Sequence, residues 1–309
     1  MRFRTALGTL LLLTPGTLIA QPAAAATPAT IAYAQWTHTW ELVLTNGDVV
    51  ELPEALAKAP DDVVNAGEWA PFLISGDGRH FFYFRKSDGL FVERTLNGKE
   101  RVVSRNLTTA SIDEEWPLVS YDGSYVVTTT SAPGVGIFAD LRKGKVLPPP
   151  GKTDAWGFIG FSQDGKRLML AGDRLTVFDR GLRVRMRLKT SLDPVALAND
   201  HVTSAVTVGT YPKYRKLRML NLRTGRASST VTVRLPRGQY IDDLDFDQAG
   251  HVIVRSRTKT GVAIYRVSKA TGKVTPLRTI ARPDAVLWVL PGDSTYEAWT
   301  IKKGRTPQK

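Results

Sequence analysis

Glycine-bearing turns recur along this chain at a regular interval, and this repeat limits the fold more than any other feature of the sequence. One series consists of Gly47, Gly98, Gly144, Gly181, Gly225 and Gly272. The first and last of these lie 225 residues apart, which is five steps of 45 residues. Each turn follows a short run of alternating apolar and polar residues, such as LTVFD or VAIYR. Runs of this kind are typical of half-buried β-strands.

A second series of turns falls between the first. Its clearest member lies in FSQDGKRLML, residues 161–170, which predicts a strand, an Asp-Gly turn and another strand. Similar turns lie at Asp77-Gly78 and Asp122-Gly123, with weaker versions at Asp200, Gly250 and Gly292-Asp293. Asp-Gly between alternating runs predicts a hairpin with a type I′ turn. Two hairpin turns in every 45 residues give four strands per repeat, which is the pattern of β-propeller blades.

The repeat predicts an all-β fold, a single six-bladed β-propeller of four-stranded blades. Five complete blades should begin near Trp69, Glu115, Trp156, Pro194 and Asp242. The sixth should combine two strands from the start of the chain, near Glu41 and Val50, with two from its end, near Leu287 and Tyr296. Closure of this kind removes an open sheet edge. We expect a linker at residues 27–39, the propeller at 40–303 and a basic tail at 304–309. The alternatives are a seventh blade within residues 27–36 and a many-stranded β-sandwich.

The motif FSQDGKRLML, followed by LTVFD and a glycine-bearing turn, resembles the TolB-type propeller repeat, a relative of the WD repeat. The Trp-Asp dipeptide of true WD repeats is absent from these units. The resemblance implies a propeller used for binding or scaffolding more than for chemistry.

The first 26 residues have the three parts of a secretory signal peptide. Arg2 and Arg4 precede an apolar run, and small residues at 23–26 offer a cleavage site. The alternative, a retained membrane anchor, is disfavoured by Pro15 and the shortness of the run. We therefore expect a chain exported by the general secretory route, secreted or associated with the cell envelope and not spanning the membrane. The chain contains no cysteine, which excludes disulfides and thiolate sites.

The formal net charge of +13 favours anionic surroundings. In LRVRMRLK, residues 182–189, the basic side chains share one face because a strand has a period of two. This run should be an outermost strand, with edge protection as the plain interpretation and binding of an anionic cell-wall polymer as the functional one. The candidate polymer-binding residues are Arg183, Arg185, Arg187, Lys189, Lys213, Arg215, Lys216 and Arg218.

Carboxylates precede each predicted innermost strand, and three are accompanied by tryptophan. If innermost strands start at one face of the ring, these residues should gather at the channel mouth. The candidate ligand-binding residues are Glu68, Trp69, Glu115 (with Glu114), Trp116, Asp154, Trp156, Asp193, Asp242, Asp243 and Asp284. Gathered carboxylates recruit a cation or raise one another's pKa. The plain interpretation is local capping of strand ends.

Catalytic motifs are weak. The sequence lacks a G-x-S-x-G motif, and Ser162 should simply end a strand. His38, His80, His201 and His251 lack metal-ligand spacing and should lie in surface turns. We predict a non-catalytic, monomeric binding module with a protein or peptide partner, no nucleic acid and no cofactor. The alternatives are a lyase or hydrolase that uses channel carboxylates and a divalent cation at the channel mouth, and the polymer binder.

Overall fold

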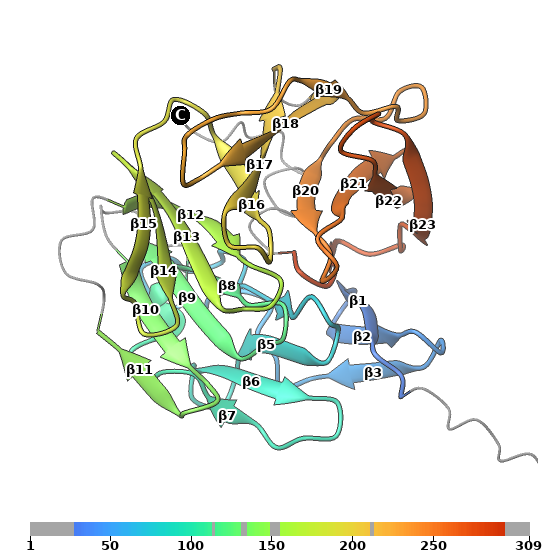
Figure 1. Ribbon diagram of the computed structural model, residues 1–309. Coiled ribbons are helices and arrows are strands. Elements are labelled where there is room, and N and C mark those ends of the chain that lie inside the picture. The colour runs from blue at the N-terminus through green and yellow to red at the C-terminus, as the bar shows by residue number, and fades with distance from the viewer. Residues whose placement is uncertain (1–27, 113–114, 131–134, 149–154, 211–212, 294–309) are drawn as a thin grey trace, which may run out of the picture.

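The strands form six four-stranded antiparallel sheets arranged in a ring, a six-bladed β-propeller (Figure 1). The structure, a computed structural model, describes residues 28–112, 115–130, 135–148, 155–210 and 213–293. Among these residues the helical content is one 3₁₀ turn, Thr109–Ser111. The predicted all-β fold and the number of blades are therefore confirmed.

Each of blades 1 to 5 is built from four consecutive strands, numbered from the centre of the ring outward. Blade 1 contains β4 (Leu73–Ile74), β5 (His80–Phe84), β6 (Phe91–Thr95) and β7 (Arg101–Val102). Blade 2 contains β8 (Glu115–Val119), β9 (Tyr125–Thr130), β10 (Val135–Asp140) and β11 (Lys145–Leu147). Blade 3 contains β12 (Ala155–Phe161), β13 (Arg167–Gly172), β14 (Leu175–Asp179) and β15 (Val184–Leu188). Blade 4 contains β16 (Pro194–Leu197), β17 (Thr203–Val208), β18 (Lys216–Asn221) and β19 (Val231–Thr232). Blade 5 contains β20 (Asp243–Phe246), β21 (Val252–Thr258), β22 (Gly261–Val267) and β23 (Val274–Ala281).

The closing blade joins the two ends of the chain, as predicted, but in a different proportion. Its order is β24 (Leu287–Val289), β1 (Ile31–Trp36), β2 (Trp40–Leu44) and β3 (Val49–Leu52). One C-terminal strand therefore pairs with three N-terminal strands, and the expected two-plus-two division is wrong. Residues 31–36, expected in the linker, form β1, which pairs with β24 from Ala34↔Val289 to Trp36↔Leu287. Tyr296 and the expected tail at 304–309 lie outside the described residues, as does the expected signal peptide.

The turns between the first and second strands lie where the sequence predicts them but have another geometry. In blades 1 to 3, the amide of Gly78, Gly123 or Gly165 donates to the carbonyl of a serine three residues earlier, at 2.7–2.9 Å. Within each of these turns only the final glycine has a positive φ. The turns are therefore type I turns followed by one left-handed residue, not type I′ turns. The serine hydroxyls of Ser75, Ser120 and Ser162 donate to the turn aspartates at 2.5–2.8 Å.

The core lies between neighbouring blades, where the apolar faces of their sheets meet. At the junction of the closing blade and blade 1, Trp40 stacks on Phe72 with ring centroids 4.3 Å apart, and both rings are fully buried. Because burial of a large aromatic side chain contributes about 2–3 kcal/mol, this junction stabilises the closure of the ring. Among the described residues, no helix is long and apolar enough to cross a membrane.

Candidate functional site

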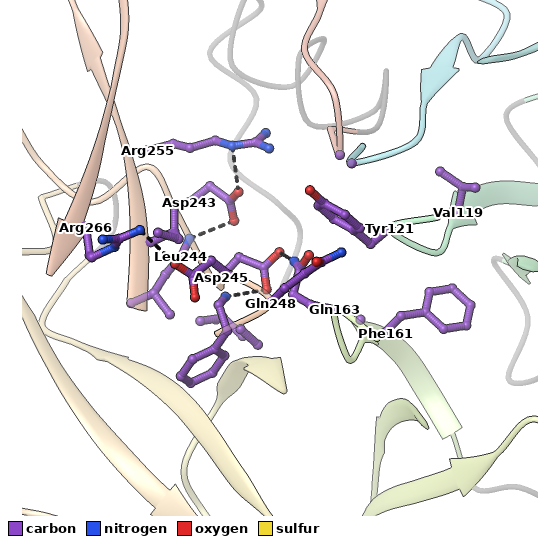
Figure 2. A pocket seen from close by; sticks show the side chains of 18 of the residues that line it. Val119, Tyr121, Phe161, Gln163, Asp243, Leu244, Asp245, Gln248, Arg255 and Arg266 are labelled. Carbon is purple, nitrogen blue, oxygen red and sulfur yellow. Dashed lines mark hydrogen bonds and ion pairs between the residues drawn. The ribbon is translucent and has the colours of Figure 1, made fainter. Parts of the chain in front are cut away.

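A cavity of about 380 Å³ occupies the centre of the ring, where the innermost strands converge (Figure 2). Blades 2 to 5 line it with residues of β8, β12, β16 and β20, and the turns that follow several innermost strands line one end. The cavity extends outward along blade 5, where residues of β21, β22 and β23 also line it. Small-molecule sites are typically clefts of about 300–1,000 Å³ lined by apolar groups and a few polar ones. The cavity is therefore large enough for a small organic ligand.

The repeat explains which side chains face this cavity. In each of blades 2 to 5, the residue two positions before the turn between the first and second strands lies on the cavity wall. These four equivalent residues are Leu118, Gly160, Ala196 and Asp245. Gly160 and Ala196 are small, and a Cβ atom added to Gly160 would have no atom within 4 Å. The centre of the ring is left open because these two positions carry almost no side chain. Asp245 is the one ionisable residue among the four.

The turns contribute a second layer of equivalent positions, one residue into each turn: Gly76, Tyr121, Gln163 and Gln248. The ring of Tyr121 lies over Gly76, where an added Cβ atom would come within 2.3 Å of it. Together with Leu118 and Ala196, Tyr121 gives the cavity an apolar part of its wall. Burial raises the pKa of Tyr121, so its hydroxyl remains a neutral donor at physiological pH.

Asp245 lies deep inside the ring, and its remaining surface faces the cavity. One carboxylate oxygen accepts the backbone amide of Phe246 at 2.7 Å, and the other accepts the side-chain amide of Gln163. No cationic side chain of the described residues is within ion-pair distance of it. Burial, with a contribution from the negative charge of Asp243, raises the pKa of Asp245 to about 7. This carboxyl group can therefore change its protonation state near neutral pH.

The other two carboxylates on the cavity wall have cationic partners. Asp243 lies 3.7 Å from the guanidinium of Arg255, which also pairs with Asp293 and donates to the carbonyl of Pro291 at 2.5 Å. Asp247 contacts His251 at 2.9 Å and Arg266 at 3.3 Å. Arg255 thus ties blade 5 to the closing blade. Asp245 remains the carboxylate of the cavity with no partner of opposite charge.

Gln163 is the second unusual group on the wall. Its side chain is only 8% exposed, and its Nε2 donates to Asp245. Its Oε1 is buried and accepts no hydrogen bond from the described residues. A buried acceptor without a donor costs about 1–3 kcal/mol, which a ligand with a donor group would relieve. Asp245 and Gln163 therefore place two acceptors together at one point of the cavity (Figure 2).

Among the described carboxylates predicted for an acidic channel mouth, Asp243 lines this cavity and the others lie elsewhere. Asp242 pairs with Arg257 at 2.7 Å, and burial raises its pKa. Glu115 accepts the hydroxyl of Thr128 at 2.5 Å, and Asp193 and Asp284 are exposed. Glu68 is half-buried beside Ala59, to whose amide its carbonyl bonds at 2.8 Å. Glu114 and Asp154 lie outside the described residues, so a complete ring of carboxylates remains a prediction.

The three predicted tryptophans lie in different surroundings. Trp69 packs edge-on against Trp36 at 5.1 Å, with the ammonium of Lys58 over its ring at the same distance. This contact joins the loop before β4 to the closing blade. Trp116 is half-buried in β8, and Trp156 lies in β12. Trp69 and Trp116 do not line the cavity.

The remaining catalytic candidates have structural roles. Ser162 is fully buried and holds its turn through Asp164. Three histidines bind carboxylates: His80 with Glu93 at 2.5 Å, His201 with Asp164 at 3.0 Å, and His251 with Asp247. His38 is exposed. In the described part of the chain, no three metal-ligating side chains gather to hold an ion. The divalent cation predicted at the channel mouth stays a prediction.

The predicted basic stripe is an outermost strand, β15. Arg183, Arg187 and Lys189 are exposed, whereas Arg185 pairs with Asp179 at 2.5 Å. On blade 4, Lys213 and Lys216 are exposed, while Arg215 and Arg218 donate to the carbonyls of Leu235 and Ser228. Exposed basic residues therefore lie on and beside β15 and also on blade 4, and their role in polymer binding remains a prediction.

Comparisons with known proteins agree with the fold alone. No protein-family model and no curated protein matches the sequence. A solved structure of hydrazine synthase from Kuenenia stuttgartiensis is 17% identical with a TM-score of 0.41, over 67% of this chain and 64% of that one. A putative TolB from Agrobacterium tumefaciens is 14% identical with a TM-score of 0.45, over 82% of this chain and 91% of that one. An oligogalacturonate lyase in complex with manganese is 13% identical with a TM-score of 0.44, over 86% of this chain and 79% of that one. The TolB-type resemblance predicted from the repeat thus has a counterpart among solved structures, and likenesses of this degree carry no functional argument.

Proposed function

We propose that this chain is a binding propeller that holds a small polar ligand in its central cavity. The observation that carries the proposal is the open wall formed by equivalent positions of four blades, where Gly160 and Ala196 leave space beside Asp245. Propeller blades surround a central channel, and in this channel a carboxyl group lies without a cationic partner among the described residues. A buried carboxyl group with a shifted pKa in such a space is typical of a functional site.

Filling the cavity tests this proposal. Because an added Cβ atom at Gly160 meets open space, Gly160→Leu should fold normally and occupy part of the ligand volume. Saturation-transfer NMR would be recorded with n-butylammonium, n-butanol, n-butyrate, benzylamine and glucose as probes. We expect at least one probe to receive saturation from the wild-type chain and to lose it with Gly160→Leu, at an unchanged urea midpoint. Absence of transfer to every probe, or transfer that survives the substitution, would overturn the proposal.

A lyase or hydrolase is the second candidate, and one observation favours it. A carboxyl group with a pKa of about 7 is suited to general acid–base catalysis at neutral pH. Such an enzyme also needs a partner group at reactive distance, and Asp243 lies on the same face of β20 because side chains alternate along a strand. Chemical conversion of a bound probe, lost in Asp245→Asn but retained in Asp193→Asn, would favour the enzyme over the binding module.

A further inference from the structure

Resting on the proposed function, we infer that the ligand of the central cavity carries a protonated amine, whose ammonium group binds between the carboxylate of Asp245 and the amide oxygen of Gln163. The apolar wall formed by Leu118, Ala196 and Tyr121 then receives the carbon skeleton of the ligand. The inference concerns the chemical class of the ligand and its dependence on pH.

The hydrogen-bonding groups at this point of the cavity are acceptors. The orientation of the Gln163 amide is set by Asp245, which accepts from Nε2 and so leaves Oε1 as the free group. The backbone amide of Phe246 is already used by Asp245 itself. A carboxylate ligand would bring a third acceptor to two acceptors, whereas an ammonium group brings three donors.

The charges around the cavity give the same result. Five charged groups line it, and four of them are paired: Asp243 with Arg255, and Asp247 with Arg266. Outside the cavity, His251 also contacts Asp247, and Asp293 also contacts Arg255. Ionised Asp245 is therefore one negative charge in excess, which a single positive charge on the ligand would balance. Burying a charge without a partner is costly, so binding and ionisation should support each other.

A metal ion satisfies these groups less well than an ammonium group. A divalent cation takes six or more oxygen ligands, commonly from several carboxylates. Here one unpaired carboxylate and one amide oxygen are available, and the described residues provide no cluster of three ligating side chains. Tyr121 also presents an aromatic ring to the cavity, and such rings attract organic cations.

The protonation of Asp245 should control binding. With a pKa of about 7, Asp245 is mostly ionised at pH 8 and only a few per cent ionised at pH 5.5. Apparent affinity falls with the fraction of protein in the competent state, so an ammonium ligand should bind about 30-fold more weakly at pH 5.5 than at pH 8. The charged groups that line the cavity around Asp245 form two pairs, Asp243 with Arg255 and Asp247 with Arg266, and His251 also contacts Asp247.

A matched series of four-carbon probes tests the ligand class. Dissociation constants would be measured by NMR for n-butylammonium, n-butanol and n-butyrate, and for calcium alone, at pH 8 and pH 5.5. We expect n-butylammonium to bind at least tenfold more tightly than the other probes at pH 8 and to weaken about 30-fold at pH 5.5. Asp245→Asn should remove this preference, whereas Asp173→Asn, which removes an exposed carboxylate between β13 and β14, should retain it.

The outcomes separate this inference from the proposed function. If n-butanol, n-butyrate or calcium binds as tightly as n-butylammonium, the ligand class is wrong while the cavity remains a binding site. Tight n-butylammonium binding that persists in Asp245→Asn would also overturn the inference. If none of the organic probes binds in any condition, both the inference and the proposed function are wrong.

Discussion

Replacing Asp245 with asparagine isolates the free-energy cost of holding a carboxyl group in the cavity. The variant keeps the shape of the side chain, and its oxygen can still accept from Gln163, but it cannot ionise. In the wild-type chain the pKa of Asp245 is raised from 3.8 to about 7. At about 1.4 kcal/mol per pH unit, this shift corresponds to about 4 kcal/mol. That value is an upper limit, because the carboxyl group keeps part of its surface in the cavity.

The direction of the pH dependence follows from proton binding. Between about pH 4 and pH 7, folded Asp245 holds a proton that the unfolded chain has lost, so lower pH favours the folded state. This contribution to stability is complete below about pH 4 and is lost as the pH rises through 7. The asparagine variant has no such loss. Its free energy of unfolding, relative to that of the wild type, should rise by about 2–4 kcal/mol between pH 4 and pH 8.

Urea unfolding followed by tryptophan fluorescence at each pH from 4 to 8 measures this difference directly. Contributions from all other ionisable groups are shared by the two proteins and largely cancel. Asp193→Asn is the matched control for the loss of one negative charge from an exposed position. If the difference in the free energy of unfolding between Asp245→Asn and the wild type stays constant across the pH range, the assignment of Asp245 as a buried, protonated carboxyl group is refuted.

Three further perturbations test the fold and the basic surface. Deleting the chain from Leu287 onward removes β24 and exposes the inner edge of β1, so cooperative unfolding should be lost. An unchanged melting temperature of the truncated protein would show that the ring does not depend on β24. Gly123→Ala should lower the free energy of unfolding in urea by about 1–3 kcal/mol, because φ at this position is +65° and the new Cβ atom would lie 2.5 Å from the ring of His80. Gly144→Ala is the control and should lower it less, because φ is +59° but the new Cβ atom meets open space. Replacing Arg183, Arg185 and Arg187 with threonine should change the free energy of unfolding by no more than about 0.5 kcal/mol. The same variant should be retained less strongly on an anionic cell-wall polymer at low salt. Equal retention of the variant and the wild type would mean that the basic residues of β15 only protect the sheet edge.

The blades and turns could be predicted because their information is local. Alternation within each strand and the Asp-Gly turns specify hairpins without reference to the rest of the chain, and blades 2 to 5 begin within a residue or so of the predicted positions. β1 was missed because the connection in its hairpin with β2, residues 37–39, is Thr-His-Thr and lacks the glycine that marks the other turns. The type of turn was also missed, since Asp-Gly is compatible with more than one backbone geometry.

The site was less predictable for a different reason. Asp243, Asp245 and Asp247 alternate in DLDFD, and a period of two would have placed them on one face of the innermost strand. The predicted acidic channel mouth consists of the residues at the start of each innermost strand, which include Asp243 but not Asp245. The contact between Gln163 and Asp245 joins blades 3 and 5 and exists only once the ring is closed. Its residues give no local pattern from which it could be predicted.

The pKa of the Asp245 carboxyl group in the folded protein is the measurement that tests the central claim most directly. A ¹³C NMR titration of aspartate carboxyl signals, with Asp245→Asn to assign the resonance, would give its value with and without saturating n-butylammonium. The structure predicts a midpoint near 7 in the free protein and a clear decrease when the amine is bound. A midpoint in the ordinary aspartate range, near 4, or one that the amine does not move, would contradict the claim that Asp245 is the ligand-binding carboxylate of the cavity.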